Sequence, residues 1–150
     1  RLADLDARGA ADYTAGAEQL AASMRELDSR WASGTATCAS RDLVVSHEAF
    51  AYLAAQYSLT QVGIRGVNPE IEPSPATLAS LADFVRANNV RTIYTEALLD
   101  PKVADTLAAE TGARTAVLDP IEGVAAGSSA TYVTLMDANL ASVKAGQPCQ

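Results

Sequence analysis

Residues 43–67, LVVSHEAFAYLAAQYSLTQVGIRGV, contain the pattern that decides the fold. The apolar run at residues 43–45 is typical of a short strand that is buried on both faces. Apolar side chains then recur at helical spacing and predict a helix over about residues 48–57. A second predicted strand follows at residues 61–67. This strand–helix–strand order is the unit from which parallel sheets are built.

The same alternation continues to the end of the chain. Ser74-Pro75 is typical of a helix start, with serine as the cap and proline as the first helical residue. A third strand is predicted at residues 91–95, and Pro101 and Gly112 bound the helix that follows it. A fourth strand at 115–118 precedes a last helix around residues 132–143. We therefore predict an α/β fold, with a four-stranded parallel sheet and helices on both faces.

A long amphipathic helix is predicted ahead of this sheet. Its apolar positions are spaced three and four residues apart and form one stripe, made of Tyr13, Ala17, Leu20, Met24, Leu27 and Trp31. Ser33-Gly34 is expected to end it. The favoured interpretation is that this stripe packs on the domain's own sheet. The alternative is that the helix also supports a second domain.

Composition excludes several classes of function. The chain has 150 residues, 49% of them hydrophobic, which is enough for one domain with a core. A formal net charge of −7 makes nucleic-acid binding unfavourable, because the phosphate backbone is also negative. No apolar run is long enough to span a membrane. The chain opens at Arg1 without the features of a signal peptide, so we expect a fragment or a processed chain.

The two cysteines, Cys38 and Cys149, do not have the spacing of a zinc motif. They are either buried free thiols or the two halves of one disulfide. The even count and the position of Cys149 near the end favour the disulfide, which would imply an oxidising compartment.

Ionisable side chains gather where the predicted strands end. His47, the only histidine, follows the first strand, Glu96 follows the third, and Asp119 follows the fourth. Because ligands of such sheets bind at the carboxyl ends of the strands, these residues are candidates for one site. Each also has an ordinary structural interpretation, as a buried histidine, a helix cap or a turn residue. Glu48 is more simply explained by a favourable position at a helix N-terminus.

Motifs of common enzymes are missing from the sequence. The loop with Gly123 and Gly127 lacks the lysine of a phosphate-binding loop, and no nucleophile elbow or H-E-x-x-H motif occurs. A small α/β hydrolytic enzyme could use His47 with Glu96 or Asp119, but nothing marks a nucleophile. We therefore expect a protein that is not an enzyme.

Several segments, taken in order, resemble one family. These segments are residues 44–53, 57–59, 68–74, 92–96 and 117–120. Together they share characteristic residues with the family along most of the chain. The segment N-P-E-I-E-P at residues 68–73, together with His47, is the most specific part. In these features the chain is similar to the zinc-binding branch of the metal-specific substrate-binding proteins of ABC importers.

The resemblance implies a two-lobed extracytoplasmic receptor, periplasmic or lipid-anchored, that delivers zinc to an ABC importer permease. Residues 1–34 would connect the lobes, and residues 35–150 would form the carboxyl-terminal lobe. His47 and Asp119 would be metal ligands, with Glu96 as a supporting residue or a further ligand. Export across the membrane would also suit a disulfide between Cys38 and Cys149.

The chain departs from the family pattern in one respect. The resemblance implies an amino-terminal lobe that usually supplies two more histidines, and we expect this lobe to be missing from the given chain. Zinc prefers about four ligands, so we expect an incomplete site and weak zinc binding by this chain alone. Zinc is favoured because imidazole suits it, with manganese as the alternative metal. An adhesin-like module of the same fold is the alternative function.

Overall fold

The computed structural model describes residues 2–149, and a four-stranded sheet lies at its centre. The strands are β1 (Asp42–Val45), β2 (Thr60–Gly63), β3 (Thr92–Thr95) and β4 (Arg114–Val117). They lie in the order β2-β1-β3-β4, and each neighbouring pair is parallel. The predicted α/β class and four-stranded parallel sheet are confirmed.

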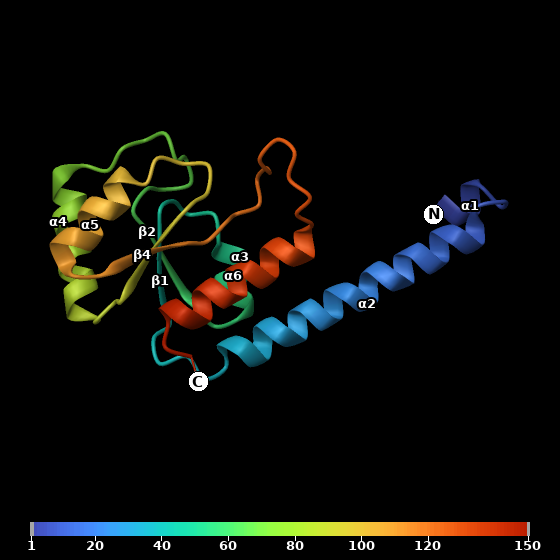
Figure 1. Ribbon diagram of the computed structural model, residues 1–150, viewed down its shortest axis with the longest axis horizontal. Helices are drawn as coiled ribbons and strands as arrows, with labels where there is room; N and C mark the ends of the chain where they lie inside the picture. Colours follow the sequence, from blue (N-terminus) through green and yellow to red (C-terminus); the bar gives the residue numbers. More distant parts are fainter. Residues whose placement is uncertain (1, 150) are drawn as a thin grey trace.

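Helices cover both faces of this sheet, as predicted (Figure 1). They are α3 (Ala51–Gln56), α4 (Pro75–Ala87), α5 (Lys102–Thr111) and α6 (Tyr132–Gly146). Successive side chains of a strand point to opposite faces, so β1 contributes to two cores. Val44 lies in the core shared with α4 and α5, whereas Leu43 and Val45 lie in the core shared with α3 and α6.

The predicted helix boundaries on either side of β3 are confirmed. The Ser74 side chain accepts a hydrogen bond from the Thr77 N–H (3.1 Å), and Pro75 is the first residue of α4. Gly112 ends α5 in the left-handed region, with a φ of 77° that glycine adopts without strain.

The long helix α2 (Ala10–Thr35) extends well beyond the sheet and carries the short helix α1 (Leu2–Leu5) at its far end (Figure 1). At 1.5 Å per residue it is about 39 Å long, three times the length of a four-residue strand. Trp31 is buried in the core shared with α3 and α6, whereas Tyr13 and Leu20 are 41% and 61% exposed. The expectation that the stripe packs on the domain's own sheet is wrong for its first half.

The helix ends at Thr35, one residue later than the predicted end at Ser33-Gly34. The Ser33 hydroxyl donates back to the Ser29 carbonyl (2.8 Å), and the helix continues to Thr35. It ends where the Arg41 guanidinium donates to the carbonyls of Thr35 and Ala36 (both 2.9 Å). A side chain from outside the helix thus satisfies its last carbonyls.

The end of α2 is fixed to α6 and to the C-terminal segment. Arg30 donates two hydrogen bonds to the Asp137 carboxylate (3.0 and 3.2 Å), and the Trp31 indole donates to the Met136 carbonyl (3.2 Å). Beyond the helix, Cys38 and Cys149 form a disulfide. The disulfide favoured from the sequence is therefore confirmed, and the free thiols are excluded.

The first connecting helix is shorter than predicted. It begins at Ala51 rather than near residue 48, because the backbone before it is engaged elsewhere. The Glu48 N–H donates to the Gly66 carbonyl (3.2 Å), and the Phe50 N–H donates to the Gln61 side chain (2.5 Å). Glu48 is thus not at a helix N-terminus, and that interpretation of it is wrong. Among the described residues, no helix is both long and apolar enough to cross a membrane.

Candidate functional site

The strand order defines where a ligand of this sheet should bind. From β1 the chain moves outward to β2, then crosses back to β3 on the other side of β1. At such a switch point, a crevice opens between the carboxyl ends of the two central strands. His47 lies two residues past the end of β1, and Glu96 directly follows β3. Both candidates therefore lie at the edge where the topology opens a site.

The turn that carries His47 is fixed by the strands on both sides. The Ser46 N–H donates to the Tyr94 carbonyl of β3 (3.0 Å), and the Arg65 N–H donates to the Ser46 carbonyl (3.0 Å). His47 itself is only 3% exposed. The imidazole is consequently held by rigid backbone rather than by a mobile loop.

His47 and Glu96 form a buried pair. The imidazole Nδ1 lies 2.5 Å from Glu96 Oε1, and both side chains are almost fully buried. An ionised carboxylate can only accept a hydrogen bond, so the proton of a neutral His47 is on Nδ1. Nε2 then has a free lone pair, which is the form of imidazole that binds a metal. The structure thus brings these two candidate residues into contact.

Burial raises the pKa of Glu96 above its ordinary value of 4.5, because desolvation disfavours the charged carboxylate. The hydrogen bond and the charge of His47 oppose this shift, and Arg65 opposes it more weakly. Keeping this carboxylate ionised beside His47 therefore lowers the stability of the folded state.

Glu122 is the residue of the site that the sequence did not reveal. Its Oε1 lies 3.7 Å from His47 Nε2, and its side chain is 66% exposed. It lies five residues beyond β4, outside the positions that directly follow a strand. Two features of the turn direct the chain so that Glu122 lies near His47. The Asp119 carboxylate accepts a hydrogen bond from the Ile121 N–H (2.8 Å), and Ile121 has a φ of 61°. The Asp-Pro sequence indicated a turn, but not its direction.

Asp119 is placed differently from the other two candidates. Its backbone is held by the buried Asn139 side chain, which bonds both the N–H (2.8 Å) and the carbonyl (2.7 Å). Asp119 lines a hollow of about 460 Å³ bordered by Tyr57 and Tyr132. Within residues 2–149 the structure records no ion pair between Asp119 and His47, so its role as a metal ligand stays a prediction.

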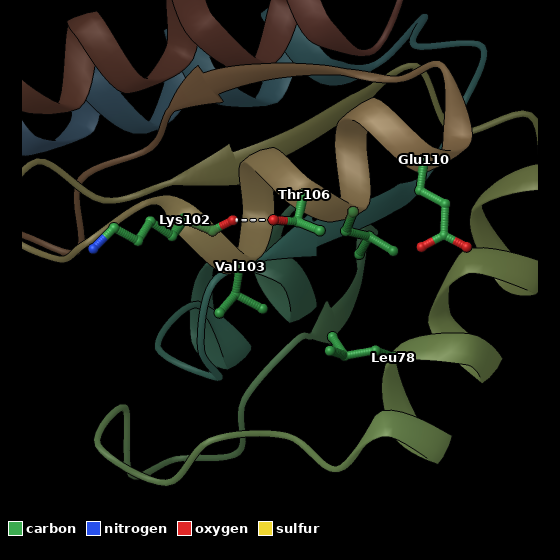
Figure 2. A pocket seen from close by; sticks show the side chains of 6 residues that line it. Leu78, Lys102, Val103, Thr106 and Glu110 are labelled. Atoms are coloured by element: carbon green, nitrogen blue, oxygen red, sulfur yellow. Dashed lines mark hydrogen bonds between the residues drawn. The ribbon is translucent and has the colours of Figure 1, made fainter.

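A separate cavity of about 160 Å³ lies between α4 and α5 (Figure 2). Its walls are mainly Leu78, Val103 and Leu107, and the Thr106 hydroxyl at its rim donates to the Lys102 carbonyl (2.8 Å). It contains none of the residues predicted for the site. Over the described part of the chain, no group of three or more His, Cys, Asp or Glu side chains is arranged to hold a metal ion.

Comparisons with known proteins show the family of the chain. The family described as ZnuA, zinc-uptake complex component A, periplasmic, matches residues 1–146. The zinc uptake protein ZnuA of Bacillus subtilis is 36% identical over 135 residues, which cover 88% of this chain and 42% of that protein. The zinc-binding lipoprotein AdcA of Streptococcus pneumoniae is 36% identical over 124 residues, 81% of this chain and 25% of that protein.

A solved structure is similar along almost the whole chain. The laminin-binding protein Lmb of Streptococcus agalactiae, described as a bifunctional protein with adhesin and metal transporting activity, has a TM-score of 0.88 and 35% sequence identity. The alignment covers 97% of this chain and 56% of that one. The chain therefore belongs to the ZnuA family, and it spans less than half the length of the curated relatives described above.

A first prediction concerns Glu96 in the metal-free protein. Because its pKa is raised in the folded state, its proton stabilises the fold below about pH 4.5, and this contribution is lost as the pH rises through the folded pKa. Glutamine does not titrate, so Glu96→Gln should not show this loss. We therefore expect the free energy of unfolding of Glu96→Gln, relative to that of the wild type, to increase between pH 4 and pH 7.5. Urea denaturation across this range measures the difference. The exposed Glu72→Gln, away from the site, is the control. A constant difference between Glu96→Gln and the wild type would show that the prediction is wrong.

Proposed function

We propose that this chain is the carboxyl-terminal lobe of an extracytoplasmic receptor that binds zinc and delivers it to an ABC importer. The observation that carries the proposal is the buried His47–Glu96 pair at the switch point of the sheet, with Nε2 directed away from Glu96. The zinc-binding relatives and the family match support the same function. The importer permease is the proposed partner.

The distance between Glu122 and His47 suits a shared zinc ion. Two zinc ligands at about 2.0–2.2 Å in a tetrahedral site lie roughly 3.3–3.6 Å apart. Glu122 Oε1 and His47 Nε2 are separated by 3.7 Å, so a small movement would let both bind one ion. We propose His47 as the imidazole ligand and a carboxylate of the loop after β4 as the second, Glu122 in preference to Asp119. An imidazole and a carboxylate favour zinc over manganese only moderately.

The rest of the site is proposed to come from an amino-terminal lobe. The chain covers 25–42% of its curated relatives, which leaves room in them for a second lobe. The first half of α2 offers an uncovered surface, with Tyr13 and Leu20 exposed. Residues 1–34 would then connect the two lobes, and residues 35–150 would form the lobe described here.

The structurally similar laminin-binding protein Lmb supports a second candidate function, in which the same fold also acts as an adhesin. Large apolar side chains are exposed on α1 and α2, including Leu5 and Leu20, and exposed apolar surface is typical of interaction sites. The same surface is where we propose the amino-terminal lobe, so zinc delivery remains the main proposal. Catalysis is not part of it.

A second prediction identifies the carboxylate ligand. In the two-lobed protein, Glu122→Gln should weaken zinc binding by about 10- to 100-fold, because an amide is a poorer ligand than a carboxylate. Asp119→Asn should have the smaller effect, since its backbone contacts with Asn139 are kept. Competition with a fluorescent zinc chelator measures both. If Asp119→Asn loses more affinity than Glu122→Gln, Asp119 is the ligand and our assignment of Glu122 fails.

A further inference from the structure

Aromatic side chains are concentrated at one hollow of this protein. The chain contains eight of them: two Phe, one Trp and five Tyr. Four line the hollow of about 460 Å³ that is bordered by α3 and by the segment from β4 to α6, and these are Phe50, Tyr52, Tyr57 and Tyr132. A fifth, the buried Trp31, stacks on Tyr57 with 5.3 Å between the ring centroids. More than half of the aromatic residues of the chain therefore gather at one concave surface.

Two of these rings are largely open to solvent. Tyr52 is 95% exposed and Tyr132 is 53% exposed. Aromatic side chains stabilise a fold mainly when their large apolar area is buried, so fold stability does not explain why both stand at the same hollow. Aromatic side chains around a concave surface are typical of a small-molecule site.

The charged groups at this hollow are negative. Within the described part of the chain, no Lys, Arg or His lines it, and Asp119 is the one carboxylate that does. A second carboxylate, Asp28, lies directly beside it and accepts a hydrogen bond from the Tyr57 hydroxyl (3.0 Å). Burial, and after it this carboxylate, raises the pKa of Tyr57 to about 12. Among residues 2–149, no ion pair to a cation is recorded for Asp28 or Asp119.

This combination favours an organic cation as the ligand. The face of an aromatic ring is the negative part of its quadrupole and attracts cations, and the two carboxylates add to the attraction. A metal ion does not suit the hollow, because no group of three or more His, Cys, Asp or Glu side chains within residues 2–149 is arranged to hold one.

The hydrogen-bonding groups of the hollow narrow the class of cation further. A guanidinium has five N–H donors and a primary ammonium has three, and each donor needs an acceptor when it is buried. The lining amide of Asn139 is already bonded to the N–H and the carbonyl of Asp119 (2.8 and 2.7 Å). The lining amide of Gln56 donates to Asp28 (3.4 Å). A quaternary ammonium has no N–H donor, so aromatic faces and nearby negative charge are sufficient for it.

We propose that this hollow binds the quaternary ammonium group of a small molecule. Tyr52 and Tyr132 supply aromatic faces at the rim, and Asp119 supplies the negative charge. The volume of about 460 Å³ lies within the range of small-molecule pockets, roughly 300–1,000 Å³. His47 does not line the hollow, so the inference goes beyond zinc binding and does not depend on it.

The competing explanation is that another part of the protein, such as the proposed amino-terminal lobe, covers this surface by apolar contact. The charge of the ligand separates the two explanations. Choline carries a trimethylammonium group, and 3,3-dimethylbutan-1-ol has the same shape with a neutral carbon in place of the nitrogen. A cation site prefers choline, whereas an apolar surface binds the neutral alcohol at least as well.

The test titrates the two-lobed protein with each probe and follows the methyl protons of the probe by NMR. We expect choline to bind at least about tenfold more tightly than the neutral alcohol. Its methyl signal should shift upfield, because ring currents have this effect on a group that lies over an aromatic face. Equal affinity for the two probes, or no binding of choline, would overturn the inference.

Substitutions at exposed positions locate the binding site. Tyr52→Leu and Tyr132→Leu should each weaken choline binding about 3- to 30-fold, and Tyr52→Phe, which keeps a ring, should restore most of the affinity. Asp119→Asn should also weaken binding, by a factor that decreases at high salt. The matched control is Tyr13→Leu, since Tyr13 is an exposed tyrosine of α2 outside the hollow. An equal loss for Tyr13→Leu would show that choline does not bind at the proposed place.

Two further measurements separate this inference from other sources of binding. A folded His47→Ala protein should keep its affinity for choline while losing zinc, and loss of choline binding would place the probe at the metal site and contradict the proposal. Vesicles of phosphatidylcholine present the same group as a lipid headgroup. We expect no co-sedimentation with them, because Asp28 and Asp119 would repel the phosphate. Co-sedimentation that is lost in Tyr52→Leu would mean that the ligand is a lipid surface rather than a small molecule.

Discussion

Replacing His47 by alanine in the two-lobed protein is expected to lower zinc affinity by about 100-fold or more. Changes to residues that only orient a zinc ligand cost roughly 10- to 100-fold, and loss of the ligand itself should cost at least as much. His47 is the only imidazole that this chain can offer. Competition with a zinc chelator of known affinity measures the effect.

The control for this prediction is the adjacent Glu48→Ala. Glu48 is exposed and makes no recorded side-chain bond to His47 in the described residues, so its variant should keep wild-type affinity. Because His47 is buried, urea denaturation must show that His47→Ala is still folded. Wild-type zinc affinity in a folded His47→Ala protein would exclude the site described above.

The double variant Cys38→Ser, Cys149→Ser should lose about 4–5 kcal/mol of unfolding free energy by the chain-entropy model. The two cysteines are 111 residues apart, so the disulfide closes a loop that includes nearly the whole lobe. For a domain of this size, such a loss corresponds to a fall in Tm of about 10–20 °C. Thermal denaturation followed by circular dichroism measures it.

The wild type in reductant is the matched control, and it should fall to the same Tm as the double variant. The end of α2 is also held by Arg30–Asp137 and by the Trp31 indole, so the fold should persist without the disulfide. A Tm of the double variant within a few degrees of the oxidised wild type would mean that these contacts already fix the C-terminal segment.

Patterns within single elements were enough to predict the core of the fold. Three consecutive apolar residues placed β1, and Ser74-Pro75 and Gly112 placed helix ends, because capping and burial depend on neighbouring residues. The limits of α2 and α3 depend on residues distant in sequence. Arg41 ends α2, and hydrogen bonds from the Glu48 and Phe50 N–H groups delay the start of α3.

The difference between local patterns and contacts distant in sequence also explains which residues of the site could be predicted. His47 lies two residues past β1 and Glu96 directly follows β3, so the parallel topology alone brought them together. Glu122 reaches His47 through a left-handed residue, Ile121, which no sequence pattern indicated.

The most direct test of the central claim is the state of the His47 ring when zinc is added to the two-lobed protein, observed by nitrogen-15 NMR of the imidazole. We expect the Nε2 resonance to shift on zinc binding, while Nδ1 keeps its proton and its hydrogen bond to Glu96. A ring that is unaffected by zinc, or one that binds zinc through Nδ1, would contradict the account.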